Sequence, residues 1–287
     1  MRPSRWIPFA VVAAALAAAA SGCTPKVLVV VDPKLCPDGG PVNATTGCVS
    51  PALVNGLVGF WHLNDETGSR IAHDSSPYGN DGVLAYLDPA AVWVAGHAAG
   101  GLAIESDGFV NVDPSPSIDS ITDQVTIAGW AFLEGTIMDY ATIASREVGT
   151  SIDQHYHISI NSRGEVPALW LNTEANTMLV QPTVAVTRQT WIHIAGTYDG
   201  TTARLYVDGQ QVASEAISGR IVADKTPFIL GANGNGASDN NVTERFPGKI
   251  DEIMLYRRAL TGSEIAQIHD GALFAVPLPG PDAGARD

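Results

Sequence analysis

The sequence predicts an all-β sandwich with one short helix near its C-terminal end. Residues 191–212, WIHIAGTYDGTTARLYVDGQQV, read as two strands and the start of a third, separated by Asp199-Gly200 and Asp208-Gly209. Two-residue Asp-Gly loops between alternating strands favour type I′ turns, because glycine accepts a positive φ. Turn residues also recur along the chain at a spacing of about ten positions, which is typical of sandwiches and barrels.

Further runs of β-forming residues are expected to complete the sandwich. They are 57–63, 101–104, 109–112, 125–133, 141–145, 155–160, 166–171, 228–230 and 249–256. The run 125–133, VTIAGWAFL, is apolar on both faces, as expected for a central strand covered on both sides. The helix is expected to begin at a capping box formed by Thr261 and Glu264 and to end at Gly271. It is short, so we expect a closure element and not a second layer.

The first residues have the features of an exported, lipidated protein. Arg2 and Arg5 precede an apolar stretch, 7–20, that is shorter than the roughly 20 residues a membrane-spanning helix needs. The segment 20–23, Ala-Ser-Gly-Cys, resembles the bacterial lipoprotein lipobox, in which the cysteine is lipidated and becomes the mature N-terminus. Alanine stands where leucine is usual, so an ordinary secretory signal is the alternative. We expect a signal peptide over 1–22, lipidation at Cys23, and an outer-membrane or cell-surface location in the envelope.

Two further cysteines, Cys36 and Cys48, would then remain in an oxidising compartment. They are expected to form a disulfide within a proline- and glycine-rich tether over 23–52. Closing so short a loop would restrict the unfolded chain by about 3 kcal/mol. The folded domain is expected over 53–274, followed by a disordered tail over 275–287.

The charge of the chain excludes nucleic acid as a partner class. Acidic residues number 30 and basic residues 16, for a formal net charge of −14, and no stripe of Lys and Arg interrupts this excess. Such a surface repels phosphate backbones. We therefore expect no nucleic-acid partner, and membrane contact only through the N-terminal lipid.

Six motifs occur in a fixed order between residues 57 and 268. They are GFWHLNDETG, AHDSSPYGNDGVL, TIAGWAF, the stretch 191–212, FPGKIDEIMLYRRAL and TGSEIAQI. This ordered set resembles the LamG-like jelly-roll domains of the concanavalin A-like lectin/glucanase group. The resemblance implies two antiparallel sheets packed face to face as a jelly roll, with the first and last strands paired. It also implies an extracellular binding module, often for carbohydrate and often with a structural calcium ion.

A structural calcium ion is expected at Asp74, Asn80 and Asp251. The loop 74–82 supplies carboxylate and amide oxygens, which are the hard donors that calcium prefers. Asp251 comes near this loop if the first and last strands pair, as the resemblance implies. The alternative is that Asp74 and Asn80 are turn residues bonded to their own backbone, and that Asp251 pairs with an arginine.

Sugar binding would need an aromatic platform beside planar polar groups. Four variable segments can supply them: 134–140, 147–156, 174–178 and 231–245. The candidate ligand-binding residues there are Tyr140, Arg146, Asp153, His155, Tyr156 and Arg245. Tryptophan and tyrosine side chains within strands are expected in the core, namely those of Trp61, Trp130, Trp191 and Tyr198. Trp93 and Trp170 are open to either role.

Metal and hydrolytic chemistry have little support in the sequence. His155 and His157 share a strand face and could hold zinc, but no third ligand is evident, and core-edge residues are the alternative. The retaining glucanases of the group place carboxylates at alternate positions of one strand, so that the catalytic pair shares a cleft. In KIDEI, 249–253, a lysine replaces the first glutamate, and Asp251 and Glu252 are expected on opposite faces. We therefore expect no enzyme activity.

The expected function is that of an exported, lipid-anchored, non-catalytic binding module for carbohydrate or another extracellular ligand. A structural lipoprotein that docks an envelope protein is the second hypothesis, and a polysaccharide hydrolase or lyase is the third. An exposed aromatic groove would favour the first, and a flat apolar patch on an outer sheet face would favour the second. Convergent charged residues in a cleft would favour the third.

Overall fold

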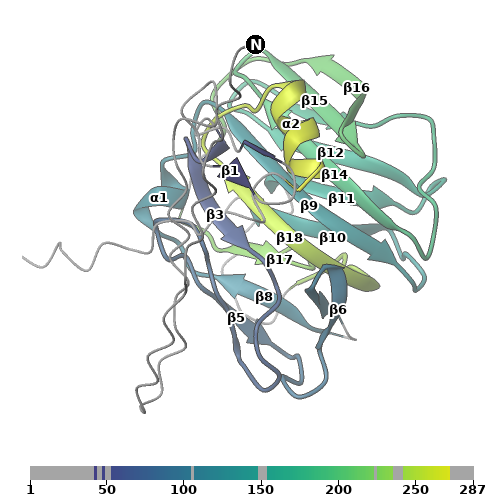
Figure 1. The fold of residues 1–287 in the computed structure, drawn as a ribbon. Helices are drawn as coiled ribbons and strands as arrows, with labels where there is room; N and C mark the ends of the chain where they lie inside the picture. The colour runs from purple at the N-terminus through teal and green to yellow at the C-terminus, as the bar shows by residue number, and fades with distance from the viewer. Residues whose placement is uncertain are drawn as a thin grey trace, which may run out of the picture. The chain divides into compact units, whose positions relative to one another are not determined.

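Two antiparallel β-sheets pack face to face in the computed structural model (Figure 1). The structure describes residues 42–43, 47–48, 53–104, 107–147, 154–222, 225–234 and 242–271. The short strands β1 (Val42–Asn43) and β2 (Gly47–Cys48) pair with each other. The all-β, two-sheet sandwich predicted from the sequence is confirmed. Cys23, Cys36 and the tail over 275–287 lie outside the described residues, as does the side chain of Cys48.

The first sheet is built around the stretch 191–212. Its strand order is β16-β15-β14-β9-β18-β7-β6, and β3 also pairs with β18. The bounds are β3 Leu57–Trp61, β6 Trp93–Ala98, β7 Gly100–Ala103, β9 Val125–Leu133, β14 Trp191–Tyr198, β15 Thr202–Val207, β16 Gln210–Ala216 and β18 Gly248–Tyr256. The β3–β18 pair brings together two strands from opposite ends of the domain, as the resemblance implied.

The second sheet has the order β13-β12-β11-β10-β17-β8-β5-β4. The bounds are β4 Ile71–Ala72, β5 Gly82–Ala85, β8 Phe109–Val112, β10 Tyr140–Glu147, β11 Gln154–Asn161, β12 Val166–Asn172, β13 Thr177–Val180 and β17 Phe228–Leu230. The sequence patterns missed β4, β5, β6 and β13. These are strands at or next to the sheet edges, and most of them are too short to show an alternating pattern.

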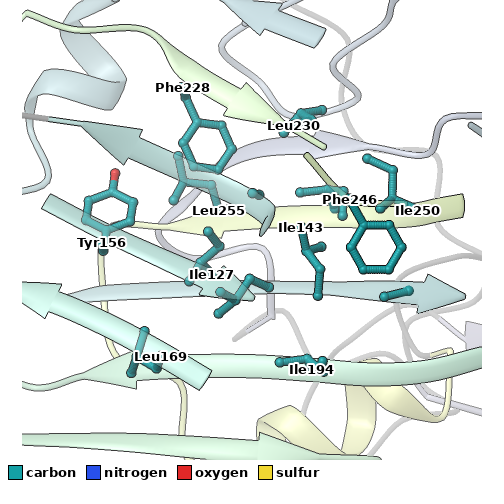
Figure 2. Close-up of a cluster of buried hydrophobic side chains, with 14 of the residues drawn as sticks. Ile127, Ile143, Tyr156, Leu169, Ile194, Phe228, Leu230, Phe246, Ile250 and Leu255 are labelled. Atoms are coloured by element: carbon teal, nitrogen blue, oxygen red, sulfur yellow. The ribbon is translucent and has the colours of Figure 1, made fainter. Parts of the chain in front are cut away.

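Apolar side chains from both sheets fill the space between them (Figure 2). Ile127 and Ile194 of the first sheet and Ile143 and Leu169 of the second are buried there. Each such side chain contributes roughly 1.5–3 kcal/mol when it is fully buried. Because side chains of a strand alternate between faces, the intervening positions of the second sheet face outward. That outward face carries the candidate site described below.

The two predicted Asp-Gly turns differ. Asp208 and Gly209 both have positive φ and join Val207 directly to its partner Gln210, as a type I′ turn requires. The loop after Tyr198 is longer, since Tyr198 pairs with Ala203, and only Gly200 has a positive φ. The Asp199 carboxylate accepts the backbone N–H groups of Thr201 and Thr202, so side-chain bonding replaces the two-residue turn there.

The predicted C-terminal helix is present as α2 (Gly262–His269). The Thr261 side chain accepts from the Glu264 backbone and Glu264 reaches back, which confirms the capping box. Ile265 and Ile268 pack on the outer face of the first sheet, so α2 is a cover and not a layer (Figure 1). A second, very short helix, α1 (Pro116–Asp119), was not predicted. No helix in the described parts of the chain is long and apolar enough to cross a membrane.

The tryptophan predictions are confirmed with one exception. Trp61, Trp130 and Tyr198 are buried, as expected, although Trp130 is buried on the outer face of the first sheet, against His97 and His269, and not between the sheets. Trp191 was expected in the core but is only half-buried, because it faces outward on β14, opposite to the inward Ile192. Its ring contacts Phe132 on the neighbouring strand β9, at a centroid distance of 5.4 Å.

Candidate functional site

A groove lies between the segment that follows β9 and the segment that leads into β18. It encloses about 500 Å³ and is lined by Ile104, Glu134, Gly135, Thr136, Met138, Tyr140, Glu244, Arg245, Phe246, Pro247 and Gly248. Backbone bonds hold its two sides together: the N–H groups of Glu134 and Gly135 both donate to the carbonyl of Pro247, at 3.1 and 2.8 Å. Two variable segments that are distant in sequence, 134–140 and 231–245, therefore meet at one place.

Tyr140 is the aromatic side chain of the groove. It is the first residue of β10 and is half-buried. Its hydroxyl accepts a 3.4 Å hydrogen bond from the side-chain amide of Asn161 on β11. Burial raises the pKa of this hydroxyl, and the carboxylates of Asp139 and Glu244 raise it further, so the phenol stays neutral.

The Tyr140 ring also lies against two aromatic residues of the outward face of the second sheet. His157 and Trp170 occupy paired positions on β11 and β12, and their rings stack with centroids 6.0 Å apart. Tyr140 meets both edge-on, at 6.2 and 6.4 Å. An aromatic group therefore adjoins the groove.

Several polar atoms of this face have no hydrogen-bond partner in the described parts of the chain. They are both ring nitrogens of His157, the hydroxyl of Ser159 and the indole N–H of Trp170. Burial lowers the pKa of His157 to about 3, so the ring is neutral at physiological pH. Buried polar groups are nearly always hydrogen-bonded in folded proteins. Three adjacent side chains with unmet hydrogen-bonding capacity are a place where a buried water would be stabilised.

The other wall of the groove carries charge. The Glu244 carboxylate accepts a 2.8 Å bond from the side chain of Asn233, and burial raises its pKa. The Arg245 guanidinium lies 3.6 Å from the carboxylate of Asp107. On the opposite side, Glu134 lies 3.1 Å from the Lys249 ammonium. The groove thus combines an aromatic ring with planar charged groups.

The predicted ligand residues divide into three sets. Tyr140 and Arg245 line the same groove. Arg146 and Tyr156 were expected at a ligand surface, but their exposed fractions are only 1% and 0%. Both side chains face the interior of the sandwich. Arg146 donates there to the carbonyl of Ile118 and to the carboxylate of Asp119. Asp153 and the side chain of His155 lie outside the described residues. Of the two histidines considered as zinc ligands, the structure therefore describes only the side chain of His157, which is buried.

The expected calcium ligands are occupied by other contacts. Asp74 accepts the backbone N–H groups of Phe60, Ser76 and Asn80 at 2.7–2.8 Å. The Asn80 side-chain amide donates to the carbonyl of Val58. These bonds match the alternative in which Asp74 and Asn80 organise their own loop.

Asp251 has a separate set of partners, the backbone N–H groups of His97, Ala98 and Glu252. In this arrangement backbone N–H donors face the carboxylate oxygens of Asp251, as they do those of Asp74. The described residues contain no group of three or more His, Cys, Asp and Glu side chains placed to hold a metal ion. Calcium binding stays a prediction.

The described residues form an antiparallel β-sandwich with a groove lined by polar and aromatic side chains. Over residues 105–266 the chain matches the family model described as concanavalin A-like lectin/glucanases superfamily. The match covers more than half of the chain, and the protein belongs to this family.

Known proteins resemble the chain over parts of their length. Mouse (Mus musculus) pappalysin-1 is 34% identical over 92 residues, which are 31% of this chain and 5% of pappalysin-1. The binding domain of Paraclostridial Mosquitocidal Protein 1 has 18% identity and a TM-score of 0.56, over 76% of this chain and 53% of that one. A Trypanosoma rangeli sialidase also has 18% identity and a TM-score of 0.56, over 87% of this chain and 36% of the sialidase. The structural likenesses show a shared fold, and the chain spans only a small part to about half of these relatives.

Proposed function

We propose that this protein is a non-catalytic module that binds carbohydrate through the groove around Tyr140. The observation that carries the proposal is the position of Tyr140, which lines a groove with Glu244 and Arg245 and also contacts His157 and Trp170. Sugars present apolar C–H faces to aromatic rings and hydroxyls to planar polar groups, so both halves of this site suit them. The family membership supports the same conclusion.

A glycan array of the full chain tests this proposal. We expect binding to one class of glycan, and we expect Tyr140→Ala to weaken it by about tenfold or more, since the central ring would be lost. A matched control is Tyr78→Ala, which removes an exposed tyrosine outside the groove. Absence of binding to every glycan would contradict the proposal.

Hydrolysis of a glycan is the second candidate function, because Glu134 and Glu244 line one groove. Glycosidases use two carboxylates, one with a raised pKa, and burial raises the pKa of Glu244. Lys249 neutralises Glu134, however, and a nucleophilic or basic carboxylate must stay available to the substrate. Release of reducing ends from an array-positive glycan, lost in Glu134→Gln and Glu244→Gln, would establish hydrolysis in place of simple binding.

The proposal also includes export and a lipid anchor at Cys23, which lies outside the described residues. The support is the sequence of the first 23 residues, with its two arginines, apolar stretch and lipobox-like end. Mass spectrometry of the mature N-terminus tests it. A diacylglyceryl-modified Cys23 is expected, and an unmodified N-terminus produced by cleavage elsewhere would contradict it.

A further inference from the structure

The charges of the groove do not balance. Arg245 is matched by Asp107, and Lys249 is matched by Glu134. Glu244 has no cationic partner in the described parts of the chain, although it is half-buried and lines the groove. The unmatched charge of the groove is therefore a carboxylate beside the Tyr140 ring.

The hydrogen bonds of Glu244 leave one of its oxygens available. Oε2 accepts the bond from Asn233 Nδ2, at 2.8 Å, and a longer one of 3.5 Å from the Thr142 hydroxyl. Oε1 accepts none from the described residues. The Oδ1 atom of Asn233 also lacks a donor there, but Asn233 is buried and does not line the groove. Nε of Arg245 on the same wall also lacks a partner among the described residues, but it is buried. The acceptor that a ligand donor can reach in the groove is therefore Oε1 of Glu244.

The backbone conformation of Glu244 fixes the direction in which its side chain leaves the chain. Glu244 has a φ of 48°, in the left-handed region that a residue other than glycine adopts unfavourably. Its carbonyl accepts the Thr142 N–H at 2.9 Å, which holds the conformation against β10. Strained residues of this kind are concentrated at ligand sites, where the fold enforces a side-chain position.

We propose that the groove binds a sugar carrying a free amine, whose ammonium group bonds to Glu244 Oε1 and lies near the Tyr140 ring. This rests on the proposed function. An ammonium group supplies three N–H donors and a positive charge that pairs with the carboxylate, whereas a hydroxyl supplies a single donor and no charge. Aromatic faces also attract cations. Uronates and sulfated or sialylated sugars are disfavoured, because they would place an anion beside Glu244.

Calorimetric titration of the full chain at pH 6 tests the inference, with an oligomer of glucosamine and the same oligomer of N-acetylglucosamine as probes. Acetylation removes the positive charge and two of the donors while leaving the ring hydroxyls. We expect the amine oligomer to bind at least about tenfold more tightly. Glu244→Gln should remove this preference, and it should fold, since its amide oxygen can still accept from Asn233. Glu215→Gln, on the exposed strand β16, is the matched control and should keep the preference.

Equal affinity for the two oligomers, or a preference that survives in Glu244→Gln, would overturn the inference. The glycan array separates this failure from that of the proposed function. Equal binding of the two oligomers that is weakened for both by Tyr140→Ala would overturn the amine preference and leave carbohydrate binding intact. Failure to bind any glycan would overturn both.

Discussion

The imidazole of His97 stacks on the indole of Trp130, with ring centroids 3.4 Å apart and planes inclined by 12°. His193 and His269 also lie against Trp130, each at a centroid distance of 5.3 Å. Imidazoles from β6, β14 and α2 thus gather around one indole of β9, on the outer face of the first sheet. Burial lowers the pKa of His193 to about 3, and the nearby His269 and His97 contribute in the same direction.

Acid is therefore expected to destabilise the fold through His193. In the unfolded chain the pKa of this residue is near 6.5, whereas in the folded protein the ring resists protonation until about pH 3. The unfolded state binds the proton first, so the free energy of unfolding falls as the pH drops from 6.5 toward 3. At about 1.4 kcal/mol per pKa unit the full loss is on the order of 5 kcal/mol.

Urea unfolding at several pH values between 7 and 4 measures this effect. His193→Gln should reduce the dependence of stability on pH. Part of the dependence should remain in the variant, because burial also lowers the pKa of His157 to about 3 and this residue is present in both the wild type and the variant. An unchanged pH dependence in His193→Gln would contradict the account of this cluster.

Two serines on the outward face of the second sheet provide a matched pair. Ser159 is buried and its hydroxyl has no partner in the described residues, whereas the equally buried Ser145 donates a 3.0 Å bond to the carbonyl of Ala232. Ser159→Ala should leave stability unchanged or raise it by about 1 kcal/mol, because an unmet hydroxyl is removed. Ser145→Ala should lower it by about 1 kcal/mol, because a carbonyl loses its donor. Chemical denaturation of both variants checks the contrast, and an equal loss in the two would show that the Ser159 hydroxyl is bonded.

Gly96 is expected to be intolerant of any side chain. A Cβ atom there would lie 1.7 Å from the carbonyl oxygen of Gly100 and 2.5 Å from Oδ2 of Asp251. Gly96→Ala should therefore destabilise the protein by about 3 kcal/mol or more. Gly68 has a φ of 93° and open space where its Cβ would be, so Gly68→Ala should cost only about 1 kcal/mol of strain. Similar losses in the two variants, measured by thermal unfolding, would contradict the close approach of β6 and β7 at Asp251.

Arg146 is expected to act in folding and not in ligand contact. Its side chain is 1% exposed and bonds to the Ile118 carbonyl and the Asp119 carboxylate. Arg146→Met should lower the free energy of unfolding by about 2 kcal/mol, since Asp119 would lose its cation. The affinity of the folded fraction for an array-positive glycan should stay the same. A loss of affinity without a loss of stability would contradict this prediction and would show that Arg146 contacts the ligand.

The sequence was a good guide to the framework and a partial guide to the site. Alternation and turn residues predicted most of the strands, and the capping box at Thr261 predicted α2, because these signals depend on neighbours in the chain. Tyr140 and Arg245 were found because both lie in variable segments. Glu134 and Glu244 were missed because their shared groove depends on the pairing of β9 with β18, which local patterns do not show. The side chains of Arg146 and Tyr156 are of types that usually reach the surface, but the two residues pair across β10 and β11 on the inward face, so strand alternation buries both.

The site itself is tested most directly by amide chemical-shift mapping of the full chain with a glycan that binds on the array. The account predicts that the largest shifts fall in 134–140 and 244–248, with further shifts at His157 and Trp170 on the adjoining sheet face. Shifts confined to the outer face of the first sheet, around Trp191 and His97, would contradict it.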